Sequence, residues 1–301
     1  DVYKRQIMAN LKELRNRITS VTSTQKITRA MQMVAASKLR RAQDAVESTR
    51  PYSDKLSNVV GNLSQEMGDD DNAPKLLVGN GNSDRYLFIV ATSERGLCGG
   101  FNSAITRKAT QSARNLIKDG KEVKFLCVGK KGKAALSREF GDEIIEFFDF
   151  SEVRNLSFVQ GDSIAQKVIS LFDENKFDIC QLYYSQFESV LTQTPTEKTI
   201  IPFGLNSESD EEASSQEACY EYEPDEIDIL KDLLPRNLSI QVFRALLENF
   251  ASEQGARMSA MDNATRNASE MIDKLKITYN RSRQATITSE LIEIISGAEA
   301  L

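Results

Sequence analysis

The stretch ITSVTSTQKITRAMQMVAASK, residues 18–38, decides the fold of this chain, because its apolar residues recur at helical spacing without glycine or proline. Residues 9–60 around it contain no glycine and a single proline, Pro51. At about 1.5 Å per residue, such a helix is roughly 75–80 Å long, far longer than an average globular helix. The stripe along it is Leu11, Leu14, Ile18, Val21, Ile27, Met31, Val34, Leu39, Ala42 and Val46.

A second long helix is predicted at the other end of the chain. Residues 236–296 contain one glycine, Gly255, and no proline. Its stripe runs through Phe243, Leu246, Phe250, Met258, Met261, Ala264, Ala268, Ile272, Leu275, Tyr279, Ile287, Leu291 and Ile295. Neither helix can bury its stripe alone, so we expect the two to pair. The seam is rich in alanine, methionine, serine and threonine. A coiled coil that serves only dimerisation would have mainly leucine, isoleucine and valine at these positions.

The middle of the chain alternates between short apolar runs and amphipathic stretches, which predicts an open α/β sheet. The predicted strands are residues 86–91, 124–128, 143–148 and 178–184, with a β extension over 192–202. The predicted helices are residues 102–118, 130–139 and 158–172. Residues 207–226 carry nine acidic and no basic side chains and are interpreted as a loop. The expected domains are 8–62 and 224–301 as helical arms and 63–223 as the α/β part, with 1–7 an extension before Met8.

The composition excludes several classes of enzyme. The chain has 301 residues, four cysteines and neither histidine nor tryptophan. Without an imidazole there is no Ser-His-Asp triad, Cys-His pair or histidine-ligated zinc. The cysteines, Cys98, Cys127, Cys180 and Cys219, form no Cys-x-x-Cys pair and are expected to be buried or inert thiols. The chain contains no run of 18 apolar residues, so the sequence predicts no membrane span.

Charge is distributed unevenly along the chain. The formal net charge is −6, which taken alone argues against nucleic-acid partners. Residues 8–60, however, contain ten basic and four acidic residues, a net charge of +6. Residues 236–301 are neutral, and residues 61–235 carry −13. Such asymmetry indicates separate surfaces for separate partners, and an acidic protein suits the basic arm better than nucleic acid.

Two glycine-containing loops are candidates for phosphate sites. Residues 93–102, SERGLCGGFN, lie between a predicted strand and helix, where α/β folds bind phosphates. Their spacing matches neither the dinucleotide fingerprint nor the P-loop, which favours a tight turn that needs glycine. Residues 128–133, VGKKGK, are interpreted as a solvated turn. No nucleophile has an evident base, so we expect no catalytic residue, no cofactor and no metal.

Five motifs in sequence order resemble one family. They are residues 18–38, the run RGLCGG at 95–100, YEPD at 222–225, ASEQGARMSAM at 251–261 and YNRSRQATITSEL at 279–291. These stretches resemble the gamma subunit of the rotary ATP synthase, and the resemblance extends from residue 8 to residue 301. It implies an antiparallel coiled coil of the two long helices and a central open, Rossmann-like α/β domain.

The resemblance also implies a function. The chain would be the central rotor shaft that couples ion-driven rotation of the membrane c-ring to ATP synthesis on the beta subunits. Its partners would be three alpha and three beta subunits, the epsilon subunit and the c-ring, with no homo-oligomer and no lipid span. Because no transit peptide is evident, we expect a peripheral location at the cytoplasmic face of a bacterial inner membrane.

Individual positions follow from the same resemblance. The positions that match contacts with the alpha/beta ring are Lys26, Arg29, Met31, Arg257, Gln284, Thr288 and Glu290. Those that match contacts with the c-ring and epsilon are Tyr220, Tyr222 and Glu223. Two other readings remain open on the residues alone: a nucleotide-binding α/β enzyme with helical arms, and a homodimeric coiled-coil scaffold.

Overall fold

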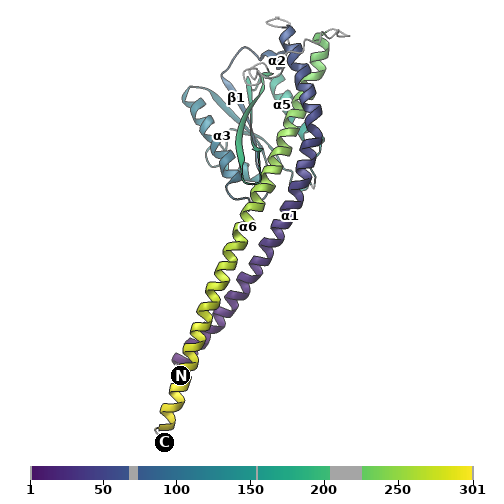
Figure 1. The fold of residues 1–301 in the computed structure, drawn as a ribbon. Coiled ribbons are helices and arrows are strands. Elements are labelled where there is room, and N and C mark those ends of the chain that lie inside the picture. The colour runs from purple at the N-terminus through teal and green to yellow at the C-terminus, as the bar shows by residue number, and fades with distance from the viewer. Residues whose placement is uncertain (1, 68–73, 154, 204–225, 300–301) are drawn as a thin grey trace. The chain divides into compact units, whose positions relative to one another are not determined.

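The computed structural model describes residues 2–67, 74–153, 155–203 and 226–299. Two very long helices, α1 (Val2–Met67) and α6 (Glu226–Glu299), are purple to blue and green to yellow in Figure 1. Contacts divide the chain into unit 1, residues 1–35 and 257–301, and unit 2, residues 36–256. Each long helix contributes to both units. The domain boundaries expected from the sequence remain predictions.

Both long helices are confirmed, and both extend further than their stripes. Pro51 lies inside α1, and Pro235 lies inside α6, which begins nine residues before it. A proline inside a helix removes a backbone donor and costs about 3 kcal/mol. Here Leu230, Leu234 and Leu238 are buried on either side of Pro235. This burial explains why the helix continues through a residue that normally ends it.

In unit 1 the two helices run antiparallel and side by side (Figure 1). The Thr28 and Thr265 hydroxyls lie 2.7 Å apart, and Gln32 Nε2 donates to Asp262 Oδ1 over 3.1 Å. Further along, Arg15 Nη2 donates to the Tyr279 hydroxyl over 3.1 Å. Residue numbers rise along one helix as they fall along the other, so the register is antiparallel throughout. The predicted antiparallel pairing is confirmed.

Unit 2 contains a five-stranded sheet in the order β3-β2-β1-β4-β5. The strands are β1 (Arg85–Ala91), β2 (Glu122–Val128), β3 (Ile144–Phe148), β4 (Ile179–Phe187) and β5 (Gln193–Ile201). The first four are parallel, and β5 pairs with β4 in the antiparallel sense. The helices of this unit are α2 (Lys75–Val78), α3 (Phe101–Lys118), α4 (Lys130–Leu136) and α5 (Phe158–Asp173). The predicted open α/β sheet is therefore confirmed.

Two element ends and one short helix differ from the prediction. Helix α4 ends at Leu136 and not at residue 139, because the amides of Glu139 and Phe140 both bond to the Leu136 carbonyl in a closing turn. Strand β4 continues to Phe187, since β5 pairs with it as far as Phe187. The short helix α2 was not predicted, because four residues are too few to show helical periodicity.

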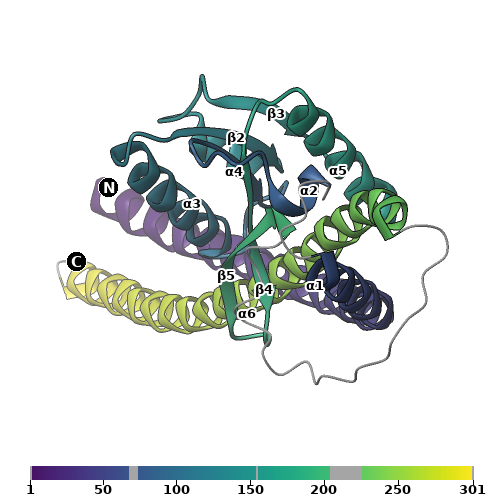
Figure 2. The same ribbon diagram turned by 90° about the horizontal axis from the view of Figure 1, so that it is seen from above.

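Successive side chains of the central strand alternate between two cores. Leu87, Ile89 and Ala91 of β1 face a cluster with α5 and residues 238–246 of α6. Phe88 and Val90 face the opposite cluster, which contains Ile105 of α3 and Leu136 of α4. Figure 2 shows α3 and α5 on opposite sides of the sheet. Unit 2 is thus three layers, helix, sheet and helix, as open α/β sheets require.

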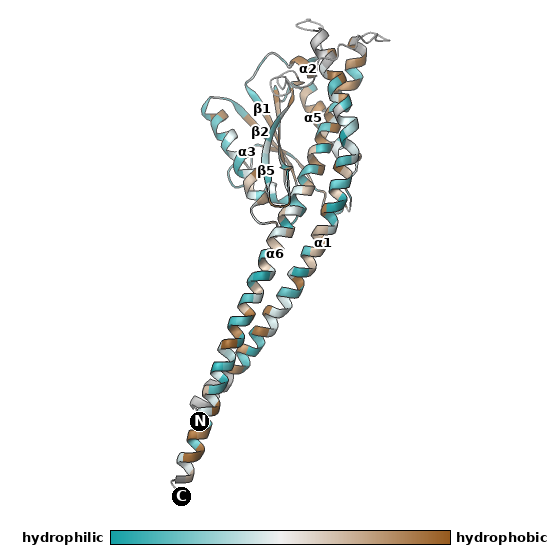
Figure 3. Ribbon diagram, in the orientation of Figure 1, coloured by the Kyte–Doolittle hydropathy of each residue, from teal (hydrophilic) through white to brown (hydrophobic). Residues whose placement is uncertain are grey.

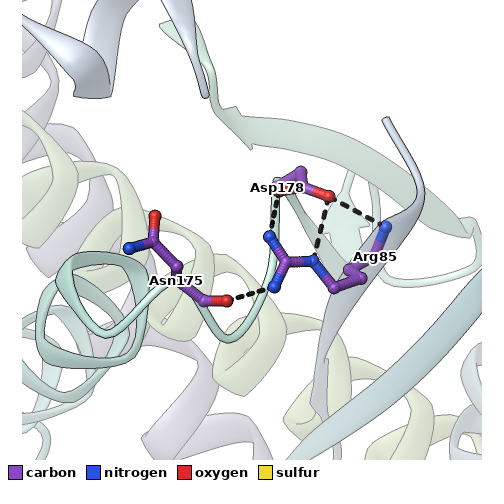
Figure 4. A network of polar contacts seen from close by, with 3 residues as sticks. All are labelled: Arg85, Asn175 and Asp178. Atoms are coloured by element: carbon purple, nitrogen blue, oxygen red, sulfur yellow. Dashed lines mark hydrogen bonds and ion pairs between the residues drawn. The ribbon is translucent and has the colours of Figure 1, made fainter. Parts of the chain in front are cut away.

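An ion pair between a half-buried arginine and a buried aspartate joins the amino ends of β1 and β4. The side chain of Asp178 is fully buried, and its Oδ1 lies 2.7 Å from Arg85 Nη2. Asp178 Oδ2 accepts from Arg85 Nε and from the Arg85 amide, while Arg85 Nη1 donates to the Asn175 carbonyl (Figure 4). The guanidinium lowers the pKa of the Asp178 carboxyl, foremost through the side-chain hydrogen bond. The pair therefore stays ionised and fixes two neighbouring parallel strands.

Candidate functional site

Unit 1 leaves apolar side chains of both helices exposed. Ile27 of α1 is 59% exposed, and Leu291 and Ile295 of α6 are 54% and 57% exposed. These residues belong to the stripes expected to be buried by pairing, so for them that expectation is wrong. Two paired helices bury only the narrow seam where they meet. Figure 3 shows hydrophobic and hydrophilic residues interspersed along both helices.

The seam itself combines apolar side chains with hydroxyl groups. Met261, Ala268 and Ile272 are buried on α6, and Thr28 is nearly buried on α1. The Thr265 hydroxyl that meets Thr28 also bonds to the Met261 carbonyl over 2.7 Å. Small side chains let the helices approach closely, and hydrogen bonds satisfy the polar groups that this approach buries. The seam thus holds the pair in register and leaves the outer faces for other contacts.

The predicted contact residues on α1 lie within two turns of the helix. Lys26 and Arg29 are exposed and lie three residues apart, so they share one side of α1. Met31 is half-buried. It lies five residues after Lys26, which corresponds to a rotation of about 140° around the helix axis, so its side chain points to a different side of α1. The structure therefore brings the two cations together and separates Met31 from them.

The predicted contact residues on α6 form two groups. Arg257 is half-buried, at the first residue of α6 in unit 1. Gln284 and Thr288 are exposed one turn apart, with the Thr288 hydroxyl donating to the Gln284 carbonyl over 3.0 Å, and Glu290 is half-buried. The 27 residues from Arg257 to Gln284 span about 40 Å of helix, so no single small partner loop can reach both.

The loop between β1 and α3 is a closed hydrogen-bonded turn. Gly99 has φ +58°, which confirms the expected need for glycine, and Leu97 has φ +65°. Asn102 Oδ1 accepts from the Ser93 amide over 2.9 Å, and Asn102 Nδ2 donates to Cys98 Sγ over 3.2 Å. The Glu94 carboxylate accepts from the amides of Lys130 and Phe150. The Glu94 carboxylate thus takes backbone donors that follow β2 and β3, so these donors are not free to bind a phosphate.

The three described cysteines are buried free thiols. Desolvation raises the pKa of Cys127 to about 12 and the pKa of Cys180 well above its usual value. Such thiols are poor nucleophiles and poor metal ligands at neutral pH. Within the described residues, no three histidine, cysteine, aspartate or glutamate side chains are grouped to hold a metal ion. In the same part of the chain, no helix is both long and apolar enough to cross a membrane.

Some predicted residues lie outside the described part of the chain. They are Tyr220, Tyr222 and Glu223, together with Cys219 and the acidic stretch that precedes them. The exposed apolar residues of unit 1 were missed as contact candidates. Their helical spacing made them look like ordinary seam positions, and no feature of the sequence distinguishes the two.

Comparisons with known proteins agree with this architecture. Residues 10–301 match the family model described as ATP synthase. The ATP synthase gamma chain of Mesorhizobium japonicum is 59% identical over 294 residues, 98% of this chain and 100% of the relative. The ATP synthase gamma chain of Brucella ovis is 58% identical over the same coverage.

Solved structures give the same result for the fold. A chain in the central stalk/c-ring structure of Tetrahymena thermophila mitochondrial ATP synthase has a TM-score of 0.60 and 26% identity, covering 79% of this chain and 99% of that one. A chain of the Euglena gracilis mitochondrial ATP synthase rotor has a TM-score of 0.63 at 19% identity, covering 93% and 99%. On the strength of the full-length relatives, the chain belongs to the ATP synthase gamma chain family.

Proposed function

We propose that this chain is the rotating central shaft of an ATP synthase, with unit 1 inside a ring of three alpha and three beta subunits. Rotation of the membrane c-ring would turn the chain, and the turning shaft would change the nucleotide affinity of each beta subunit in sequence. ATP would form on the beta subunits, and this chain would supply no catalytic group. Its place would be peripheral, at the cytoplasmic face of a bacterial inner membrane.

The observation that carries this proposal is the exposed apolar surface of unit 1. Ile27, Leu291 and Ile295 are each more than half exposed, and pairing of the two helices alone does not cover them. A sleeve of partner subunits around the pair would cover them from several directions. A homodimer would cover one side only, which makes the scaffold reading the poorer explanation.

The two faces of unit 1 differ, and rotation requires that difference. The α1 face carries the exposed cations Lys26 and Arg29, whereas α6 at the same level, next to Thr265, exposes Asn267 and Glu270. As the shaft turns, a given beta subunit would meet these faces one after another. A partner with two conformations shifts toward the one that the facing surface stabilises, which is how turning would drive a change in affinity.

Unit 2 would connect the shaft to the epsilon subunit and the c-ring. Tyr220, Tyr222 and Glu223 are the residues proposed for that contact. The two units would thus divide the work, with torque entering through unit 2 and acting through unit 1.

Reconstitution with rotation readout tests the proposal. The full chain is mixed with alpha and beta subunits of a close relative, and a bead is attached through Lys176→Cys, an exposed position in unit 2. We expect a complex that hydrolyses ATP and turns the bead in one direction. Leu291→Ala with Ile295→Ala should weaken assembly, while Ser289→Ala on the same turns should not. Correctly folded subunits that form no complex with this chain would contradict the proposal.

A further inference from the structure

One strand residue of unit 2 is bonded to α6 through both of its backbone groups. The Ser185 amide of β4 donates to Asn249 Oδ1 over 3.1 Å, and Ser252 Oγ donates to the Ser185 carbonyl over 2.9 Å. All three residues are buried. Asn249 and Ser252 are three residues apart on α6 and therefore lie on the same side of the helix. These two bonds fasten α6 to the sheet at one backbone position.

The strands beside β4 do not take up these two backbone groups. Ser185 lies opposite Pro195 of β5, and proline has no amide hydrogen, so this pair cannot exchange the two hydrogen bonds of an antiparallel ladder. On the other side, β1 pairs with β4 only as far as Tyr183. Asn249 and Ser252 therefore supply the acceptor and the donor that these buried backbone groups require.

This contact lies where α6 leaves unit 2. Unit 2 ends at Ala256, about one helical turn after Ser252. In the same turns of α6, Ala251 is fully buried in a cluster with Leu39 and Ala42 of α1. Apolar packing is non-directional and by itself lets one helix roll or slide on its neighbour. Two directional hydrogen bonds to one strand residue resist both movements.

Other polar contacts of α6 in unit 2 lead to helices. Ser239 Oγ donates to Asp162 Oδ1 of α5 over 2.9 Å, and Arg244 Nη1 donates to Ser53 Oγ of α1 over 3.3 Å. The contact with Ser185 differs from these because it reaches the backbone of a strand that is paired on both sides. Such a strand cannot move without the rest of the sheet, so this contact ties α6 to the whole of the sheet.

From this placement we propose that Asn249 and Ser252 form the joint through which unit 2 turns α6. The inference rests on the proposed function of the chain as a rotating shaft. Torque that reaches the sheet passes through Ser185 to α6 just before the helix enters unit 1. The same two bonds carry torque in the opposite direction when ATP hydrolysis turns unit 1. Asn249 and Ser252 are positioning residues and touch no partner subunit in this role.

Bead rotation in the reconstituted complex tests the joint, with the alpha/beta ring fixed and the bead attached to unit 2 through Lys176→Cys. In this arrangement ATP hydrolysis turns the bead through the joint. Slips, in which ATP is consumed and the bead does not advance, should become about fivefold more frequent in Ser252→Ala, because one buried hydrogen bond is lost. Asn249→Leu keeps the branched shape of the side chain, removes the acceptor and should increase slipping by a similar factor.

Ser239→Ala is the matched control. It makes the same chemical change on the same helix and removes a hydrogen bond to α5, so its slips should stay within about twofold of the unmodified chain. The two serine variants should lose similar stability in urea, because each loses one hydrogen bond of a buried serine. A difference in slipping between them therefore cannot come from stability.

The outcomes separate the joint from the proposed function. An unmodified chain that forms no complex, or that does not turn the bead, would overturn the shaft and the joint with it. When the unmodified chain turns the bead, frequent slips in Ser252→Ala and Asn249→Leu with few in Ser239→Ala support the joint. Slips as rare as those of the unmodified chain in the two joint variants, or equally frequent slips in Ser239→Ala, would overturn the joint and leave the shaft standing.

Discussion

Gly161 of α5 lies directly against Phe243 of α6. A β-carbon built on Gly161 would lie 2.6 Å from the Phe243 β-carbon and 2.8 Å from its α-carbon, closer than side chains can approach. The two helices meet backbone to side chain at this point because Gly161 has no side chain. This contact joins the layer formed by α5 to the part of α6 in unit 2.

Gly161→Ala should therefore destabilise the protein by about 1–3 kcal/mol, since overpacking forces the helices apart. Urea unfolding followed by circular dichroism measures the difference. Gly61→Ala is the matched control, because Gly61 lies in α1 with nothing within 4 Å of its added β-carbon. That change should stabilise by roughly 0.5–1 kcal/mol. Equal stability of Gly161→Ala and the wild type would show that α5 and α6 have room to separate.

Asp178→Asn should lower the free energy of unfolding by about 1–3 kcal/mol near neutral pH, because it leaves the Arg85 guanidinium without its carboxylate. The folded-state pKa of Asp178 lies below its ordinary value of 3.8. A lowered folded pKa gives stability that is present above pH 4 and lost as the pH falls through the folded pKa.

The stability difference between the wild type and Asp178→Asn should therefore be constant at neutral pH and shrink as the pH drops below about 4. Unfolding at a series of pH values measures it. Asp142→Asn, at an exposed aspartate of the same unit, should show little difference at any pH. A difference that grew with acidification would contradict the role of the ionised pair.

Cys127 and Cys180 should resist alkylation in the folded chain at pH 8. The pKa of Cys127 is raised to about 12 and that of Cys180 is also raised, both chiefly by desolvation, so almost no thiolate is present. Mass spectrometry after timed iodoacetamide treatment follows each site. Lys118→Cys supplies an exposed reference thiol that should react within minutes. Labelling of Cys127 as fast as that reference, without unfolding, would rule out its burial.

Charge reversal on α1 tests the proposed contact with the alpha/beta ring. Lys26→Glu together with Arg29→Glu should reduce ATP-driven proton pumping of a reconstituted complex about fivefold or more, since each surface ion pair is worth up to about 1 kcal/mol. Arg17→Glu reverses an exposed charge of the same helix away from the proposed contact and should have a smaller effect. Equal losses in all variants would indicate a general effect of charge on assembly.

The sequence by itself determined the two long helices, the α/β sheet and the family of this protein. Helical spacing over residues 9–60 and 236–296 predicted α1 and α6, and alternation of apolar runs predicted the α/β sheet. These features are local, because backbone geometry imposes the period of each element on its own residues. The absence of histidine likewise needed no structure to exclude imidazole chemistry.

Tertiary structure alone decided what each apolar or polar residue meets. Ile272 and Leu291 belong to the same apolar stripe of α6, yet Ile272 is buried and Leu291 is more than half exposed. The pairing of Thr28 with Thr265 and the closeness of Gly161 to Phe243 join residues far apart in the chain. Register and burial depend on the volumes of side chains on another element, and the period of a single helix carries no information about them.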